Sequence, residues 1–126
     1  MLDQETETLS GKIIGAAIEV HKTLGPGLLE SAYQQALAYE FAHQAIDFKI
    51  EVSLSVVYKE VKLDCAFKAD FVVEDKIIVE LKAVERLMPI HQAQLLTYLQ
   101  LTKIRLGLLF NFNNLVLTRG IKRMIL

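Results

Sequence analysis

The chain has 126 residues, a formal net charge of −1 and 52% hydrophobic residues. This length suits one domain with its own core, and the apolar content excludes a disordered protein. The charge argues against strong affinity for nucleic acid in general, because such binders carry a basic surplus. A local basic patch is still compatible with this net charge. Arg119, Lys122 and Arg123 form the one basic cluster, and its simplest interpretation is a solvated edge.

The sequence also indicates where the protein works. Apolar stretches such as 13–18 and 106–110 are too short to span a bilayer, so no membrane partner is expected. The N-terminus lacks the basic and apolar regions of a signal peptide. Cys65 is the only cysteine, which excludes an intrachain disulfide and fits a reducing, cytoplasmic setting.

The N-terminal region predicts a helix that ends at a sharp break. Residues 1–8 are acidic and are expected to be frayed, and 9–126 are expected to form a single domain. A helix is predicted over 10–24, because Ser10 is a good N-cap and apolar residues recur at helical spacing. Gly25-Pro26-Gly27 then ends that helix.

A second helix is predicted over about 28–45. It carries two apolar stripes and is expected to be mostly buried. Glu30 lies near its start, where it either interacts with the helix dipole or serves as a further acid of a site. Tyr33 follows one turn later and is interpreted as a core residue with its hydroxyl at the rim.

From Phe48 onward the apolar residues alternate, which is typical of strands. On the second strand this alternation assigns Phe67, Phe71 and Val73 to one face and Lys68, Asp70 and Val72 to the other. The predicted elements are a strand from Phe48, a turn near 59–60, strands over 61–73 and 76–82, a helix over 89–102, a buried strand over 105–112, and one or two edge strands from 115–117 and 121–125. This order predicts an α+β, α/β/α-like fold with a central mixed sheet flanked by helices.

Three charged residues interrupt the apolar pattern of the second and third strands. Glu80 and Lys82 project to the same side of one strand. If 74–76 form a three-residue hairpin loop, Asp70 lies opposite Glu80, with Cβ atoms roughly 5 Å apart. Two carboxylates and an ammonium group on an apolar sheet fit a Mg²⁺ or Mn²⁺ site. The alternative is a structural ion cluster on a solvent face, although exposed ion pairs contribute only about 0–1 kcal/mol.

The third predicted helix carries polar residues on one face. His91, Gln94 and Tyr98 are spaced so that they share that face. A Gln–Tyr pair after a strand that bears Glu-x-Lys suggests a site. Taken alone, these residues are ordinary for the rim of a protein.

Together these segments resemble known families. Asp70, followed by Glu80-Leu81-Lys82, resembles the D…(D/E)xK core of the PD-(D/E)XK nuclease superfamily. Gln94-Leu95-Leu96-Thr97-Tyr98 resembles the QxxxY motif of its RecB-like branch. With Gly27-x-x-Glu30-x-x-Tyr33 added, the chain is similar from about Ile13 to Ile125 to the GxxExxY family of small bacterial proteins. Two departures are Ala69, where the superfamily has its proline, and Tyr33, where some members have Arg.

The resemblance implies a restriction-endonuclease-like core and a metal-dependent nuclease that hydrolyses phosphodiester bonds of DNA or RNA. The implied catalytic residues are Glu30, Asp70, Glu80 and Lys82, lined by Gln94 and Tyr98. Mg²⁺ or Mn²⁺ would be held by Asp70, Glu80 and the Leu81 carbonyl, with Glu30 as a further ligand. Lys82 would orient or deprotonate the attacking water.

Two other functions stay open. The first is a catalytically silent nuclease-fold module that binds nucleic acid or a protein partner. The second is an interaction protein in which an edge strand, 105–112 or 121–125, pairs with another subunit. The apolar end Met124-Ile125-Leu126 favours a homodimer or larger oligomer, which is also compatible with catalysis.

Overall fold

The computed structural model describes residues 2–126, apart from the side chains of 64–66, which include Cys65. In chain order the elements are α1 (Gln4–Leu24), α2 (Glu30–His43), β1 (Phe48–Tyr58), β2 (Val61–Val73), β3 (Ile77–Lys82), α3 (Pro89–Thr102), β4 (Leu106–Asn111), the short 3-10 helix η1 (Leu117–Gly120) and β5 (Ile121–Ile125). This confirms the predicted α+β fold. Among these described helices, none is long and apolar enough to cross a membrane.

The strands form one five-stranded sheet in the order β1-β2-β3-β4-β5. Strands β3 and β4 are parallel, and the other neighbouring pairs are antiparallel. The parallel pair needs a crossover connection, which α3 supplies. The mixed sheet predicted from the element order is therefore confirmed.

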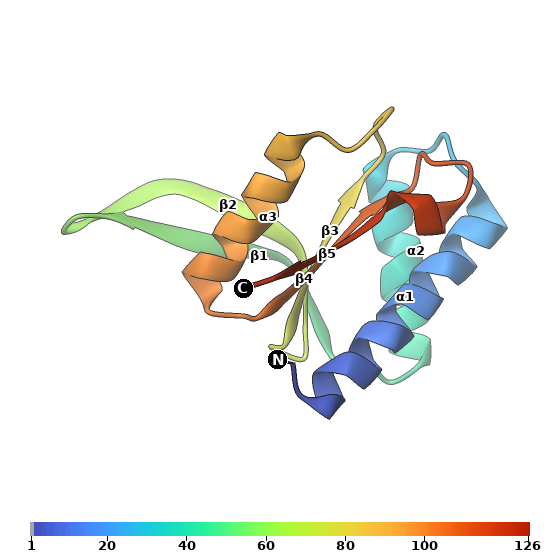
Figure 1. The fold of residues 1–126 in the computed structure, drawn as a ribbon, viewed down its shortest axis with the longest axis horizontal. Helices are drawn as coiled ribbons and strands as arrows, with labels where there is room; N and C mark the ends of the chain where they lie inside the picture. The colour runs from blue at the N-terminus through green and yellow to red at the C-terminus, as the bar shows by residue number, and fades with distance from the viewer. Residues whose placement is uncertain (1) are drawn as a thin grey trace.

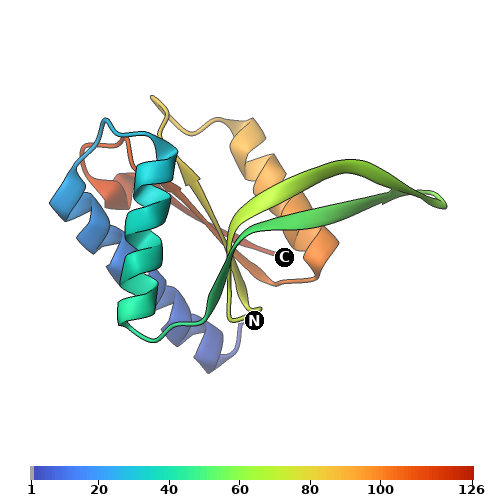
Figure 2. The same ribbon diagram turned by 180° about the vertical axis from the view of Figure 1, so that it is seen from behind.

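Helices cover both faces of the sheet (Figures 1 and 2). Helices α1 and α2 pack on one face, where the core includes Ile13, Leu37, Phe71 and Phe110. Helix α3 packs on the other face, where the core includes Ile78, Leu95, Leu99 and Leu109. Because both faces are covered, a charged side chain that points from the middle of the sheet is withdrawn from water.

Strands β1 and β2 continue beyond the sheet as a two-stranded arm, which we define as residues 51–70. Only residues 71–73 of β2 pair with β3, and the rest of β2 pairs with β1 alone. Figures 1 and 2 show the arm projecting away from the body of the molecule. At its root Glu51 adopts a φ of 50°, a left-handed conformation that is uncommon for a residue other than glycine.

The predicted alternation of β2 is wrong at the root of the arm, where the strand changes direction. The Phe67 ring lies 5.6 Å from the Tyr98 ring on α3, centroid to centroid. Phe71 and Val73 lie in the core with α1 and α2. Phe67 therefore does not share their face, because the ribbon twists where it leaves the sheet.

Helix α1 begins earlier than the sequence analysis predicted. The Asp3 carboxylate accepts a hydrogen bond from the Thr6 N–H at 2.7 Å and acts as the N-cap, so Ser10 does not. Residues 4–8 are therefore helical rather than frayed, and the Thr6 side chain is buried. The Lys76 ammonium group also lies 2.6 Å from the Glu5 carboxylate.

Helix α2 buries only one of its two apolar stripes. Tyr33, Leu37 and Phe41 face the core. On the other stripe, Leu29 at the N-cap is 78% exposed and Tyr39 is 67% exposed. The expectation that this helix is mostly buried is therefore wrong for Leu29 and Tyr39.

The C-terminal strands also differ from the prediction. Strand β4 pairs with β3 on one side and β5 on the other, so it is an interior strand that cannot pair with another subunit. Residues 115–117 form no strand, and η1 precedes β5 instead. Strand β5 does lie at the edge of the sheet, as expected.

Candidate active site at the divergence of β2 and β3

Asp70 and Glu80 meet where β2 separates from β3. Residues 74–76 form the predicted turn, and the ladder pairs Val73 with Ile77 and Phe71 with Val79. Beyond the pair of Phe71 with Val79, β2 and β3 are joined by hydrogen bonds between side chain and backbone instead of by the backbone ladder. The Asp70 N–H donates to Glu80 Oε1 at 2.9 Å, and the Leu81 N–H donates to Asp70 Oδ2 at 2.7 Å. The predicted register is confirmed, and the two acids fix each other across the split.

The two carboxyl groups are placed where ionisation is unfavourable. Glu80 is only 6% exposed. Burial, followed by the nearby charge of Asp70, raises the pKa of Glu80 to about 8. Burial also raises the pKa of Asp70, although the hydrogen bond from the Leu81 N–H opposes that shift. Ionising both acids would therefore bury negative charge that a bound cation would relieve.

Lys82 and Leu81 complete the end of β3. Lys82 points to the same face as Glu80, since they alternate with Leu81, and its positive charge opposes the raised pKa values of both acids. In a strand, the N–H and C=O groups of one residue point to the same edge. The Leu81 N–H points to Asp70, so the Leu81 carbonyl faces the same side of β3.

Helix α2 brings Glu30 to this end of the sheet. Glu30 Oε2 accepts a hydrogen bond from the Ala83 N–H at 3.3 Å, directly after Lys82. The negative charge of Glu30 contributes to the raised pKa values of Asp70 and Glu80. Glu30 is thus close enough to act on both acids, although its side chain is exposed and bonded to the backbone.

Tyr33 has a structural place within the Gly27-x-x-Glu30-x-x-Tyr33 segment. Its side chain is fully buried and stacks on Phe112, with ring centroids 4.5 Å apart. Its hydroxyl donates to the Gly25 carbonyl at 2.6 Å and accepts from the Leu28 N–H at 3.1 Å. Gly27 has a φ of 99°, which favours glycine. Tyr33 therefore holds the loop from which α2, and with it Glu30, begins.

Helix α3 places Tyr98 beside the acids. Tyr98 is 7% exposed, and burial, followed by the charges of Glu80 and Asp70, raises the pKa of its hydroxyl. Gln94 lies half-buried one turn earlier on the helix. His91 is used to cap the helix, because its Nδ1 accepts from the Met88 N–H at 2.9 Å. Of these three residues, Tyr98 has the clearest electrostatic link to the acids.

Three residues near the acids were missed from the sequence. Glu51 lies opposite Asp70 at the root of the arm, and its charge contributes to the raised pKa of Asp70. Gln34, one turn after Glu30, donates to the Asp70 carbonyl at 3.4 Å. Its spacing of four residues from Glu30 on the same helix was the available signal.

Asn111, the third missed residue, is fully buried at the end of β4. Its Nδ2 donates to the Val84 carbonyl at 2.9 Å, and its Oδ1 accepts from the Val84 N–H at 3.1 Å. The Phe112 N–H donates to the Lys82 carbonyl at 2.9 Å. These bonds tie the loop after β3 to the end of β4, and so set the backbone on both sides of Lys82. The available sequence signal for Asn111 was its position as a polar residue directly after an apolar run.

The donor set is suited to a hard cation. Among the described residues, no three His, Cys, Asp or Glu side chains are arranged as a complete metal-binding group. Asp70 and Glu80 nevertheless supply two neighbouring carboxylates. Mg²⁺ needs only one or two carboxylates and completes its octahedron with water and phosphate oxygens. The residues present therefore fit such an ion, with Asp70 and Glu80 as its principal protein ligands.

Comparison with known families identifies the superfamily of the chain. The family model described as the PD-(D/E)XK nuclease superfamily matches residues 7–124, which is nearly the whole chain. The chain belongs to the PD-(D/E)XK nuclease superfamily. The match includes Asp70, Glu80 and Lys82, so the acids and lysine at the split lie within the matched region. No curated protein and no solved structure gives a significant match.

Membership in the PD-(D/E)XK superfamily gives the protein a nuclease-like character. Nucleases of this superfamily generally act on nucleic acid and use divalent metal ions. The sheet with helices on both faces agrees with a restriction-endonuclease-like core, as predicted. The similarity to the GxxExxY family remains a resemblance carried by Gly27, Glu30 and Tyr33.

Proposed function

We propose that this PD-(D/E)XK protein is a metal-dependent nuclease that hydrolyses phosphodiester bonds of DNA or RNA. The observation that carries the proposal is the meeting of Asp70 and Glu80, bonded to backbone N–H groups across the split between β2 and β3, with Lys82 beside them. When both acids are ionised, the positive charge of Lys82 opposes but does not cancel the cost of burying them, since their pKa values stay raised. Mg²⁺ or Mn²⁺ would supply the missing positive charge, lower the pKa of a bound water and polarise the scissile phosphate.

Four residues would hold such an ion. Asp70 and Glu80 each use one carboxylate oxygen for a backbone N–H, which leaves the other oxygen for a metal. The Leu81 carbonyl faces the same edge, and Glu30 lies near enough to ligate through water. This assigns the principal contacts to β2 and β3 and the outer contact to α2.

The protein groups would then act on water and phosphate. Lys82 orients or deprotonates the attacking water and stabilises the charge that develops on the phosphate. The water oxygen bonds to phosphorus, the bond from phosphorus to the leaving oxygen breaks, and the leaving oxygen takes up a proton. Gln94 holds the water or a phosphate oxygen. Tyr98 stays protonated, since its pKa is raised, and packs against the substrate backbone.

A second candidate is a nuclease-fold module that binds nucleic acid or a protein partner without cutting. Two observations favour it: the net charge of −1 and the lack, among the described side chains, of a complete three-residue metal group. The retained acids and lysine favour the nuclease. For either candidate, we propose a reducing, cytoplasmic setting, because the chain has a single cysteine.

The deciding experiment measures cleavage of single- and double-stranded DNA and RNA with Mg²⁺, Mn²⁺ or EDTA. We expect metal-dependent cutting that Lys82→Ala reduces by about 10²–10⁴-fold, the usual contribution of a positioned proton-transfer group. Lys122→Ala, an exposed lysine on β5, is the matched control and should cut like the wild type.

Two results would contradict the nuclease proposal. Cutting that persists unchanged in Lys82→Ala would point to a contaminating nuclease. Absence of cutting by the wild type under every metal and substrate condition would favour the binding module instead.

A further inference from the structure

The arm has no established role in the fold, although it starts at the proposed catalytic acids. This inference rests on the nuclease function proposed above. Within residues 61–70, β2 has no strand partner except β1, and the pair extends into solvent (Figure 2). Asp70 stands at the point where the arm joins the sheet. A ligand lying along the arm would therefore reach the acids at its root.

One face of the arm packs toward α3. Leu54 is 5% exposed and lies in the core with α3, and its ladder partner Phe67 contacts the Tyr98 ring. This apolar side fixes the orientation of the arm. The opposite side is therefore the one that stays available to a ligand.

Alternation places four polar residues on that opposite side. Ser53 and Ser55 flank Leu54 on β1, so they point away from α3. Lys68 is the ladder partner of Ser53, and Lys62 is the partner of Val57. The register shifts between Leu54 and Val56, but burial on β1 still alternates across that shift, so both lysines share the side of Ser53. All four residues are exposed, and together they are called the polar face of the arm.

The polar face carries the chemistry that a phosphate backbone requires. Two ammonium groups and two hydroxyl groups can each donate hydrogen bonds to phosphate oxygens. Within the described residues, the ion pairs are Lys76–Glu5 and Arg123–Glu7, so neither lysine of the polar face is held in one. The acid nearest to this face on β1 is Glu51, which lies at the root beside Asp70.

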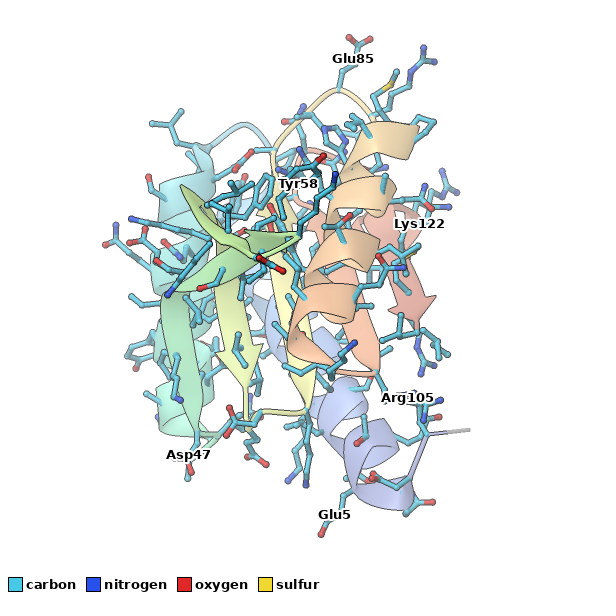
Figure 3. All side chains as sticks on the ribbon, turned by 90° about the vertical axis from the view of Figure 1, so that its left-hand side faces the viewer. Glu5, Asp47, Tyr58, Glu85, Arg105 and Lys122 are labelled. Atoms are coloured by element: carbon cyan, nitrogen blue, oxygen red, sulfur yellow. The ribbon has the colours of Figure 1, made fainter. Side chains whose placement is uncertain are left out.

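The dimensions and the charge of the molecule agree with this assignment. A strand rises about 3.4 Å per residue, which places Lys62 roughly 25 Å along the arm from Asp70. Arg119, Lys122 and Arg123 lie away from the arm in the sheet order, because Lys122 and Arg123 are on β5, at the opposite end from β1, and Arg119 is in η1 directly before it. Figure 3 looks along the arm, with Tyr58 at its tip toward the viewer and Lys122 beyond α3.

We propose that the polar face of the arm holds the sugar-phosphate backbone of the nucleic acid and directs it to Asp70 and Glu80. Lys68 contacts a phosphate close to the cleavage position, and Lys62 contacts one farther along the strand. A protein with almost no net charge thereby gains a local cationic surface where its chemistry needs it.

The test separates binding from cleavage by using Lys82→Ala as the background. Binding of labelled single- and double-stranded oligonucleotides, long enough to span the arm, is followed by fluorescence anisotropy at several salt concentrations. We expect Lys62→Ala with Lys68→Ala to raise Kd about tenfold at moderate salt and to reduce the salt slope by about two, the loss expected for two phosphate contacts. Lys122→Ala in the same background is the control and should leave both quantities unchanged, and circular dichroism confirms that each variant is folded.

Cleavage then distinguishes failure of this inference from failure of the nuclease proposal. In an active protein, the paired lysine variant should raise KM for long substrates more than it lowers kcat, and this loss should shrink as the substrate is shortened. If nothing is cut but binding still depends on both lysines, the nuclease proposal fails and the polar face stands. If the paired variant binds and cuts like the wild type, or if the wild type binds no nucleic acid, the polar face is not the binding surface. A change of oligomeric state with unchanged binding would equally overturn the inference and assign the arm to contacts between copies of the chain.

Discussion

Glu80 is the residue of the candidate site whose protonation the fold changes most clearly. Its side chain is buried on a sheet whose two faces are both covered by helices, and it accepts a hydrogen bond from the Asp70 N–H. Burial and the charge of Asp70 raise its pKa from 4.5 to about 8. Between these two pH values the folded chain binds more protons than the unfolded chain, so stability falls as the pH rises.

This shift makes a prediction for the metal-free protein. We expect the contribution of Glu80 to be most favourable below pH 4.5 and to be lost progressively up to about pH 8. Glu80→Gln should flatten the decline of Tm with pH, because an amide carries no charge. Thermal unfolding in EDTA across this range measures it, with Glu85→Gln in the exposed loop as the control. The same decline in Glu80→Gln as in the wild type would contradict the assignment.

Among single residues, those placed by a short turn were predictable and those placed by the fold were not. Asp70 and Glu80 could be paired because the three-residue turn at 74–76 sets their register. Glu51 looked like one more outward residue of an alternating strand, and only its φ of 50° reveals the irregularity at the root of the arm. The place of Asn111 depends on the parallel pairing of β3 with β4, which is distant in sequence.

At the scale of elements, Asn111 makes a second prediction, because it joins β4 to the loop after β3. Asn111→Ala removes bonds to both the N–H and the C=O of Val84 and leaves these groups partly buried. We expect a loss of about 2–3 kcal/mol of unfolding free energy. We also expect weaker cleavage, because the backbone around Lys82 loses its support. Urea unfolding measures the stability, and activity assays measure the cleavage.

Asn113→Ala is the matched control for this variant. Asn113 is exposed and contributes its backbone N–H, not its side chain, to Asn111. It should therefore unfold at the urea concentration of the wild type. A wild-type midpoint for Asn111→Ala would show that the hydrogen bonds between Asn111 and Val84 contribute little to stability.

The elements themselves were predicted well where periodicity and breakers agreed. Helix α3 follows the predicted bounds 89–102 because Pro89 suits the first turn and apolar residues follow at helical spacing. The predicted start of α1 was wrong because the acidic residues 1–8 were expected to be frayed, whereas Asp3 caps a helix that already includes residues 4–8. The end of the chain was misjudged because 115–117 is apolar but leads into a 3-10 turn.

The surface of the whole molecule carries a third prediction, about self-association. Exposed apolar side chains gather around the loop between α1 and α2: Leu29 is 78% exposed and Leu28 is 41% exposed. A hollow lined by Gly25, Pro26 and Leu115 adjoins this loop, and Leu115 is 86% exposed. Such contiguous apolar surface is typical of contact sites. At the C-terminus, where the sequence predicts another contact between subunits, Ile125 is 54% exposed.

We expect light scattering after gel filtration to give a mass above the 14.2 kDa of one chain. Leu29→Ser with Leu115→Ser should return the protein to that mass, because it removes two highly exposed apolar side chains from this surface. Ile125→Ser is the control that tests the C-terminal contact by itself. A wild type that runs as a single chain at micromolar concentration would contradict the prediction of an oligomer.

The order of pairing in the sheet also sets an order for assembly. The turns at 59–60 and 74–76 join neighbouring strands, so β1, β2 and β3 can pair through local contacts. The parallel pair of β3 and β4 closes only after α3 has crossed the sheet, which is an entropically slower step. During synthesis the two carboxylates can therefore come together while still in water. They become difficult to ionise only when the last third of the chain covers them, so the reactive character of the site is acquired late in folding.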